Sequence, residues 1–329
     1  TATLEGVSYT VSYNANGGTN APASQTKTHG VDLTLTSDIP TYTGYTFAGW
    51  TTNQDGTGDN YAAGAVYTAN ASVTLYAKWV AGSGTGYTVY HYFENVNDTN
   101  YTLYKTENKT GTTGATITLA NEKIAIVGGT YKQGSLTEGG AVATTTTISA
   151  DGTTKIYLYY SRNTYTLTLN KNSYVDSVSG AGTYKYGASV SIDATLGSAE
   201  GYTYSFTNWT SSNTSLVPNQ ATKSATITMP TGDVTLTANA SRTAITYTIS
   251  YELDGGAVSG TNPTSYTIES ENITLINPTK EGYTFAGWTG TGLSSATKTV
   301  TIPTGSTGNR TYTANWDLAQ YTLTVNDGT

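Results

Sequence analysis

Alternating apolar and polar residues mark out strands along the whole chain. In the segment 73–79 (VTLYAKW), apolar residues alternate with Thr, Tyr and Lys, and the same alternation recurs at 156–160, 234–238 and 312–316. A period of two places successive side chains on opposite faces of a strand. The helical period of 3.6 is confined to short stretches such as 120–124, which is long enough for one turn. The pattern predicts a mainly β protein with little helix.

Turn-forming residues follow two of the predicted strands. The segment 16–18 (NGG) follows the strand 9–13, and 254–256 (DGG) follows the strand 247–251. Gly, Asn and Asp tolerate the positive φ that tight turns require. We therefore expect a turn after each of these strands.

The heptapeptide GYTFAGW occurs twice, at Gly44–Trp50 and at Gly282–Trp288. Tyrosine-led strands recur at similar intervals, beginning at Tyr9, Tyr87, Tyr165, Tyr247 and Tyr321. Self-similarity at a nearly fixed interval indicates an array, and each unit is long enough to hold its own core. The chain is therefore expected to be a tandem array of small β modules.

The heptapeptide also predicts a local distortion. Tyr45 and Phe47 lie on one face of a regular strand, so Trp50 falls on the other face. We predict that residues 48–49 form a β-bulge, which returns Trp50 to the core side. A Trp side chain buries about 150–250 Å², a large share of a small core. The tryptophans expected to share a core are Trp50 with Trp79, and Trp288 with Trp316.

The repeat divides the chain into four modules and the start of a fifth. The predicted modules are 1–81, 82–161, 162–241 and 242–318, with a truncated fifth unit at 319–329. The predicted linkers are 82–86, 161–164, 241–246 and 317–320. Linkers this short limit the freedom between neighbours and favour an extended arrangement.

Several motifs recur in the same order in the first and fourth predicted modules. In the first they are 9–13, Gly17-Gly18, Pro40, 44–50 and 75–79 (LYAKW); in the fourth they are 247–251, Gly255-Gly256, Pro278, 282–288 and 312–316 (YTANW). Both modules resemble the Listeria–Bacteroides repeat, also called the internalin B-type repeat. The motifs span most of each module, so the resemblance is specific.

The two middle modules depart from this pattern. The third keeps 165–169, 184–187 (YKYG), 201–209 (GYTYSFTNW) and 229–239, and it is similar to a divergent form of the repeat without the closing Trp. The second resembles mucin-binding-type modules in its first strand, 87–94, but has neither Trp nor GYTFAGW.

The resemblance implies four small β-grasp-like modules of mixed sheet. It also implies a secreted or surface-anchored bacterial protein in which such modules stand in tandem near the cell wall. Some members are thought to support adhesion or signalling to host cells. The family offers no catalytic residue to carry over.

Composition narrows the classes of function. The chain has 28 Tyr and 5 Trp, no Cys, 11% charged residues and a net charge of −7. The aromatic content argues against disorder, and the acidic balance argues against binding of nucleic acid or anionic membranes. Without disulfides each core must hold by packing alone. No apolar stretch approaches the roughly 20 residues that span a bilayer, so we expect no membrane insertion in this segment.

Candidate chemistry is sparse. His29 and His91 lie in different modules, so a histidine metal site or a Ser–His–Asp triad is not expected. The segment 53–60 (NQDGTGDN) offers Asp55 and Asp59 as oxygen ligands for Ca²⁺, but its spacing is not that of an EF-hand and a surface turn is favoured. We expect no catalytic, cofactor or metal site, no cofactor and no enzymatic activity.

Two other features leave alternatives open. The tyrosines of the second module could form a binding surface or simply suit half-buried strands; they are Tyr90, Tyr92, Tyr101, Tyr104, Tyr157, Tyr159 and Tyr160. A Lys–Asn isopeptide bond could lock a module that has no disulfide; the strand lysines are Lys78, Lys105, Lys155, Lys185 and Lys223.

The sequence thus favours a non-enzymatic repeat segment of a bacterial cell-surface protein that acts as a semi-rigid stalk or spacer. The alternative is an adhesin in which one or more modules bind a host glycan or protein. The expected location is extracellular, at the cell surface or cell wall, with signal peptide and anchor outside this segment. The expected state is a monomer whose partners are neighbouring repeats.

Overall fold

A computed structural model describes residues 6–213, 216 and 222–324. It divides into two compact units, Thr1–Thr164 and Tyr165–Thr329. Within the described residues the protein is built from β-strands, and its one helical element is a 3₁₀ turn, η1 (Leu119–Glu122), at the segment expected to form a single turn. The prediction of a mainly β chain is confirmed.

Module 1, in the first unit, is a five-stranded mixed sheet with a small partner sheet. The sheet order is β2-β1-β7-β4-β5, formed by β1 (Ser8–Asn14), β2 (Gln25–Thr28), β4 (Tyr45–Thr51), β5 (Asn60–Tyr61) and β7 (Val73–Ala81). β1 and β7 are parallel, whereas β4 runs antiparallel to β7. The partner sheet pairs β3 (Leu33–Thr34) with β6 (Val66–Tyr67).

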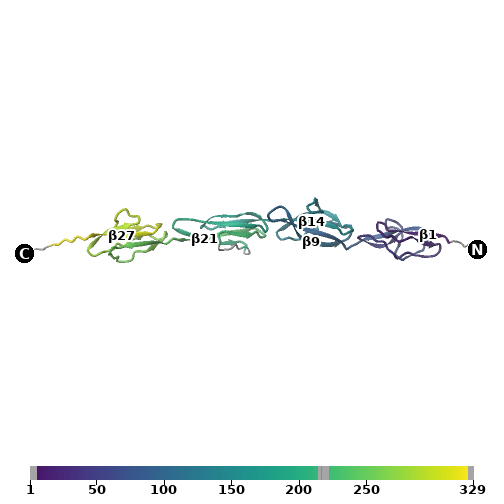
Figure 1. The fold of residues 1–329 in the computed structure, drawn as a ribbon, viewed down its shortest axis with the longest axis horizontal. Coiled ribbons are helices and arrows are strands. Elements are labelled where there is room, and N and C mark those ends of the chain that lie inside the picture. Colours follow the sequence, from purple (N-terminus) through teal and green to yellow (C-terminus); the bar gives the residue numbers. More distant parts are fainter. Residues whose placement is uncertain (1–5, 214–215, 217–221, 325–329) are drawn as a thin grey trace, which may run out of the picture. The chain divides into compact units, whose positions relative to one another are not determined.

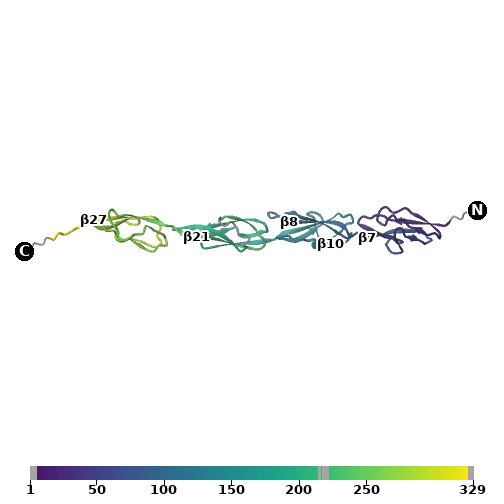
Figure 2. The ribbon, with the colours of Figure 1, turned by 90° about the horizontal axis from the view of Figure 1, so that it is seen from below.

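Module 2, also in the first unit, has the same arrangement. Its sheet order is β12-β11-β14-β8-β9, formed by β8 (Thr85–Glu94), β9 (Tyr101–Gly111), β11 (Gly129–Ser135), β12 (Val142–Ala143) and β14 (Thr154–Arg162). β8 is parallel to β14, and β11 is antiparallel to it. The partner sheet pairs β10 (Thr116–Thr118) with β13 (Thr145–Thr147). β9 and β14 are labelled in Figure 1, and β8 and β10 in Figure 2.

The second unit contains two further sheets of this kind. Module 3 has the order β17-β15-β21-β19, from β15 (Thr164–Lys171), β17 (Gly182–Lys185), β19 (Tyr202–Ser211) and β21 (Val234–Ala244), with a partner sheet of β16 (Val175–Ser179), β18 (Ser189–Leu196) and β20 (Ala225–Thr228). Module 4 has the order β23-β22-β27-β25, from β22 (Tyr247–Glu252), β23 (Ser265–Tyr266), β25 (Tyr283–Gly290) and β27 (Arg310–Leu318), with a partner sheet of β24 (Ile273–Thr274) and β26 (Thr301–Ile302). The described residues therefore hold four similar mixed sheets in tandem.

The end of the chain does not add a further strand to this array as far as it is described. Residues 319–324 form neither helix nor strand. The rest of the predicted fifth unit, 325–329, lies outside the described residues.

The predicted bulge is present. The register of β4 against β7 shifts between Phe47 and Gly49, and Gly49 has a φ of 121°. Trp50 is fully buried, and its ring centroid lies 5.1 Å from that of Phe47. Trp79 packs against the same Phe47 at 5.8 Å but is only partly buried, so it closes the edge of the core. Module 4 repeats the shift in register.

Module 3 accommodates two extra residues before its tryptophan. Its register shift follows Phe206, and Trp209 is fully buried. Since two residues are one period of a strand, the insertion lengthens β19 without exchanging its faces. Ala240 lies opposite Phe206, in the place that Trp79 takes opposite Phe47.

Module 2 contains the same bulged strand without the motif. The register of β11 shifts after Tyr131, and the strand then places Gly134 opposite Leu158. In module 1 the corresponding pair is Trp50 opposite Ala77. Gly and Leu therefore replace Trp and Ala at two facing positions of the core.

The packing around Gly134 supports an exchange of side-chain volume between the two facing positions. A Cβ added to Gly134 would lie 2.7 Å from Leu119 and 3.3 Å from Leu158. Both leucines are fully buried. They fill the space that the indole ring occupies in module 1, so module 2 keeps the shared topology with a different core.

The predicted turns are present, but all four predicted linkers are too long. Asn16 and Gly17 have φ values of 48° and 94°, as a tight turn requires. The linkers 161–164, 241–246 and 317–320 are wrong at their edges, because β14 continues to Arg162, β21 to Ala244 and β27 to Leu318. The linker 82–86 is wrong at its end, because β8 begins at Thr85. The final strand of each module keeps pairing with the start of the bulged strand, so it runs into the segment assigned as a linker.

Candidate functional site

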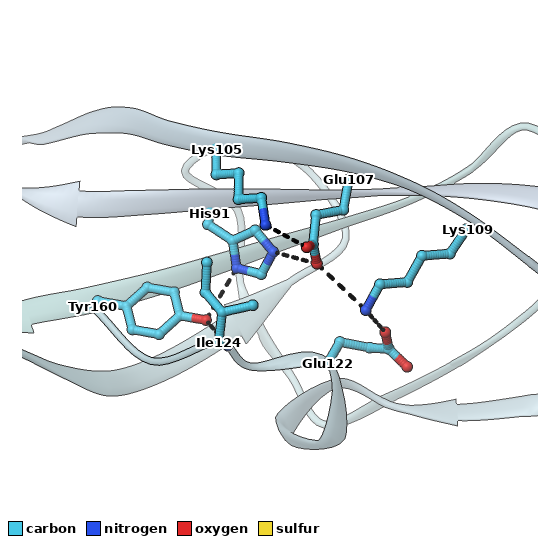
Figure 3. A network of polar contacts seen from close by, with 7 residues as sticks. All are labelled: His91, Lys105, Glu107, Lys109, Glu122, Ile124 and Tyr160. Atoms are coloured by element: carbon cyan, nitrogen blue, oxygen red, sulfur yellow. Dashed lines mark hydrogen bonds and ion pairs between the residues drawn. The ribbon is translucent and has the colours of Figure 1, made fainter. Parts of the chain in front are cut away.

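Module 2 holds a buried network of polar side chains centred on His91. His91 lies on β8 between two outward-facing tyrosines, and its side chain is 0% exposed. Its Nδ1 is 3.0 Å from the hydroxyl of Tyr160 on β14, and its Nε2 is 3.2 Å from Oε2 of Glu107 on β9 (Figure 3). Three neighbouring strands of one sheet therefore meet at a single imidazole ring.

The hydrogen bonds of the network assign the tautomer of His91. The Glu107 carboxylate can only accept, so Nε2 carries the proton and donates it. Nδ1 then accepts from the O–H of Tyr160, and the same Tyr160 oxygen accepts from the backbone N–H of Ile124 at 2.9 Å. While His91 is neutral, each polar atom in this series of hydrogen bonds therefore has a partner.

Lysines and a second carboxylate surround the exposed end of the network. Lys105 donates to Glu107 at 2.7 Å, and Lys109 lies 3.4 Å from Glu107 and 2.8 Å from Glu122. The hydrogen bond from Lys105, followed by those from His91 and Lys109, lowers the pKa of Glu107 to about 2. Burial lowers the pKa of His91, against the opposing effect of Glu107. Two lysines thus balance two carboxylates around a neutral ring.

The chemistry available to this network is proton uptake. Burial raises the pKa of Tyr160, which favours its neutral, proton-donating form. Both Tyr160 and His91 are enclosed by the sheet, and they are satisfied by partners within the module. The arrangement therefore serves the packing of module 2, and protonation of His91 is the event that would disturb it.

His29 has a different environment. It lies in module 1, with Nδ1 3.0 Å from the hydroxyl of Tyr9 in an exposed contact. Throughout the described residues, no group of three or more His, Cys, Asp or Glu side chains is arranged to hold a metal ion.

The acidic turn of module 1 is tied by its own threonines. Asp55 accepts hydrogen bonds from the backbone N–H of Thr57 at 2.9 Å and from its hydroxyl at 2.6 Å. These bonds lower the pKa of Asp55. The backbone N–H of Asp59 donates to the hydroxyl of Thr52 at 3.1 Å. The geometry is that of a hydrogen-bonded surface turn.

Four tyrosines of module 2 stack in pairs on the outer face of its sheet. Tyr90 stacks on Tyr157 at 5.0 Å, and Tyr92 stacks on Tyr159 at 5.4 Å. The Tyr92 hydroxyl donates to Glu138 at 2.8 Å, and burial together with Glu138 raises the pKa of Tyr92 to about 12. The ring faces are therefore turned towards each other across neighbouring strands.

The tyrosines of module 2 differ in their exposure. Tyr159 and Tyr160 are buried, and the Tyr159 hydroxyl accepts from the backbone N–H of Gly139 at 2.7 Å. Tyr104 is 54% exposed. Tyr101 packs edge-on against Tyr159 at 5.1 Å. The set is thus a packed outer layer with one well-exposed ring.

The structure identifies a buried lysine that the sequence did not single out. Lys27 on β2 is 1% exposed, and its Nζ donates to Asn70 Oδ1 and to the Thr28 carbonyl, each at 3.0 Å. Its strand, QTKT, shows no apolar alternation that would have marked Lys27 as buried. Of the strand lysines considered for an isopeptide bond, Lys105 is held by Glu107.

Comparisons with known families match three of the four modules. A family model described as the Listeria–Bacteroides repeat domain matches residues 9–78 and 247–315. A model described as the divergent InlB B-repeat domain matches residues 163–243. These ranges coincide with the strands of modules 1, 4 and 3.

Comparisons with individual proteins add little. No curated protein matches the chain. Among solved structures, the Bacillus anthracis TIE protein is similar at 8% sequence identity and a TM-score of 0.33, with 95% of this chain and 74% of that chain covered. A TM-score this low supports no statement about function. Among the described residues, none of the helical structure is long and apolar enough to cross a membrane.

Proposed function

We propose that this chain, which contains Listeria–Bacteroides repeat domains and a divergent InlB B-repeat domain of bacterial surface proteins, is a non-enzymatic spacer. In this role the segment holds other parts of its parent protein away from the cell envelope. The observation that carries the proposal is the packed joint between modules within each unit.

In the first unit the joint is built around Gly44, the first residue of GYTFAGW. The Gly44 carbonyl accepts the N–H of Gly82 at 2.8 Å and the hydroxyl of Thr113 at 2.8 Å. Thr113 is buried, and its N–H donates to the Gly82 carbonyl at 2.9 Å. A Cβ on Gly44 would lie 2.6 Å from the carbonyl oxygen of Ala150. Modules 1 and 2 therefore meet through backbone groups and the Thr113 hydroxyl, with no room for a side chain at Gly44.

The corresponding glycine carbonyl is used in every module. It belongs to a glycine with positive φ, and it accepts the N–H of a residue just beyond the last strand. The acceptor–donor pairs are Gly44 with Gly82, Gly128 with Asn163, Gly201 with Ile245, and Gly282 with Ala319. Each module therefore holds the first residue after its last strand by a backbone hydrogen bond.

The second unit has a joint of the same kind with different side chains. A Cβ on Gly201 would lie 2.7 Å from Ile268. The hydroxyl of Tyr202 donates to Glu269 at 3.0 Å, and the hydroxyl of Thr307 donates to Glu200 at 2.7 Å. Such contacts restrict hinge motion, and a spacer needs limited hinge motion to keep its length.

The adhesin alternative receives no matching support. A sugar-binding platform presents aromatic faces to the ligand, whereas the faces in module 2 are stacked on one another. We therefore propose no glycan or protein site on this surface.

Pulsed electron paramagnetic resonance tests the stiffness of the first joint. Because the chain has no Cys, spin labels can be placed uniquely at Thr26→Cys in module 1 and Thr106→Cys in module 2, both exposed. A spacer predicts one narrow distance distribution. A broad or multimodal distribution would contradict the proposal.

Matched glycine variants identify the contact that sets this distribution. Gly44→Ala must displace Ala150, so it should shift or broaden the distances. Gly282→Ala, with nearly the same φ (77° against 78°) but open space around it, should leave them unchanged. Gly84→Ala, in the linker between modules 1 and 2 and also facing open space, controls for the loss of a glycine near the joint.

A further inference from the structure

We propose that His91 is a proton-binding site that makes module 2 an acid-sensitive element of the chain. Uptake of one proton by the imidazole breaks the buried network, so module 2 loosens before its neighbours as pH falls. This inference goes beyond the spacer role and does not depend on it.

The hydrogen bonds give the first reason. In the neutral state Tyr160 donates its hydroxyl proton to Nδ1 and accepts the N–H of Ile124. A protonated His91 donates from both nitrogens, so Tyr160 must accept from His91 and from Ile124 together. The Tyr160 hydroxyl proton then has no acceptor in a buried position, and an unsatisfied buried donor destabilises the fold.

The charges give the second reason. The groups around His91 are Tyr160 on β14, Lys105, Glu107 and Lys109 on β9, and Glu122 on η1 behind Lys109. Two cations already balance two anions in this set. A third cation with a side chain that is 0% exposed is unbalanced and poorly solvated.

The sign of the pH dependence follows from these contacts. Burial lowers the pKa of His91 below its ordinary value of about 6.5. The unfolded chain therefore binds the proton more tightly than the folded module does. The stabilisation is complete above about pH 6.5 and is lost as pH falls from there towards the folded-state pKa.

The other modules provide internal controls. At the fifth position of the tyrosine-led strand, where module 2 has His91, the chain has Tyr13, Leu169 and Tyr251 in modules 1, 3 and 4. None of these side chains takes up a proton near neutral pH. His29, the other histidine, lies in an exposed contact in module 1, so its protonation removes no buried hydrogen bond.

Hydrogen exchange of the intact chain, read by mass spectrometry from about pH 8 to about pH 5, tests the proposal. Exchange of the segments 85–94 and 154–162 is normalised to 8–14 and 73–81 of module 1, which removes the intrinsic pH effect. The expected result is up to about tenfold faster opening of module 2 per pH unit below about pH 6.5, the limit for one proton. Unchanged relative protection across this range would overturn the proposal.

Two variants assign the response. His91→Gln keeps a side-chain donor and acceptor but cannot titrate, so it should remove the pH dependence; His29→Gln should leave it intact. If the response persists in H91Q, the proposal is wrong. If H91Q is already unprotected at about pH 8, NMR titration of the unsubstituted protein tests the proposal instead. Its two histidines give two ring signals. A His91 signal that titrates near 6.5 while module 2 stays protected would refute the proposal, and loss of protection as that signal titrates would support it.

Discussion

Ile39 in module 1 occupies the place that Asn277 occupies in module 4, directly before the proline of each module. In module 4 the indole N–H of Trp288 donates to Asn277 Oδ1 at 3.0 Å. In module 1 the indole N–H of Trp50 is buried and has no hydrogen-bond partner among the described residues. The two modules thus differ by one hydrogen-bond acceptor next to equivalent tryptophans.

The perturbation is therefore a reciprocal exchange. A buried polar group without a partner costs about 1–3 kcal/mol. Ile39 is 51% exposed, so its replacement gives up little buried apolar area. Ile39→Asn should stabilise module 1 by about 1–2 kcal/mol, and Asn277→Ile should destabilise module 4 by about 1–3 kcal/mol.

Hydrogen exchange of the intact chain measures both effects locally, because protection reports the free energy of opening of each segment. With Ile39→Asn, exchange of 45–51 should slow by roughly 5- to 30-fold while 283–290 is unchanged. With Asn277→Ile the pattern should reverse, with faster exchange at 283–290.

Ile39→Ala is the matched control, since it removes the isoleucine without adding an acceptor. It should not slow the exchange of 45–51. The reasoning fails if Ile39→Asn leaves the exchange of 45–51 unchanged or accelerates it. It also fails if Ile39→Ala protects as well as Ile39→Asn does.

Two further predictions concern module 2. Gly134→Ala places a methyl group 2.7 Å from Leu119, so overpacking should destabilise module 2 by about 1–3 kcal/mol in thermal unfolding. Gly86→Ala, whose methyl group faces open space, should have little effect. Equal effects of the two substitutions would contradict the exchange of volume between Gly134 and Leu158. Glu107→Gln removes the carboxylate whose pKa is lowered to about 2 by Lys105. The carboxylate's stabilising contribution is present above about pH 4.3 and is lost towards pH 2. The variant should therefore be less stable than the parent by about 1–2 kcal/mol at neutral pH and as stable as the parent near pH 2. Chemical unfolding that gives the same difference in stability at both pH values would refute this.

The bulge in GYTFAGW could be predicted because strand parity is a local property. Tyr45, Phe47 and Trp50 cannot share a face without an extra residue, and Gly49 supplies the backbone freedom for it. The sequence could not show that Trp79 lies at the core's edge, where its indole N–H donates to the carbonyls of Ala15 and Asn16, because this contact joins residues far apart in the sequence.

The shared topology of module 2 is hidden in the sequence for a physical reason. Gly134 and Leu158 exchange volume across two strands that are far apart in the sequence. A motif search reads one strand at a time, so it sees a lost Trp and misses the gained Leu. Packing density is restored by the pair and not by either residue alone.

The network around His91 was predictable only in part. The alternation places His91 on the opposite face of the strand from Tyr90 and Tyr92, but it does not show which face is buried. Its partner Glu107 comes from the adjacent strand in a register set by a bulge between His91 and Tyr92, and a single sequence does not reveal that register. The stacking of the tyrosines depends on the same cross-strand register.

The spacer role is tested most directly by the radius of gyration of the intact chain in small-angle scattering. A strand of ten residues such as β8 spans about 33 Å, so four modules end to end span roughly 130 Å, and a rod of that length has a radius of gyration of about 38 Å. A compact globule of 329 residues has a radius of gyration of about 20 Å. A value near 38 Å with a rod-like profile is the predicted result, and a value near 20 Å would contradict the proposed function.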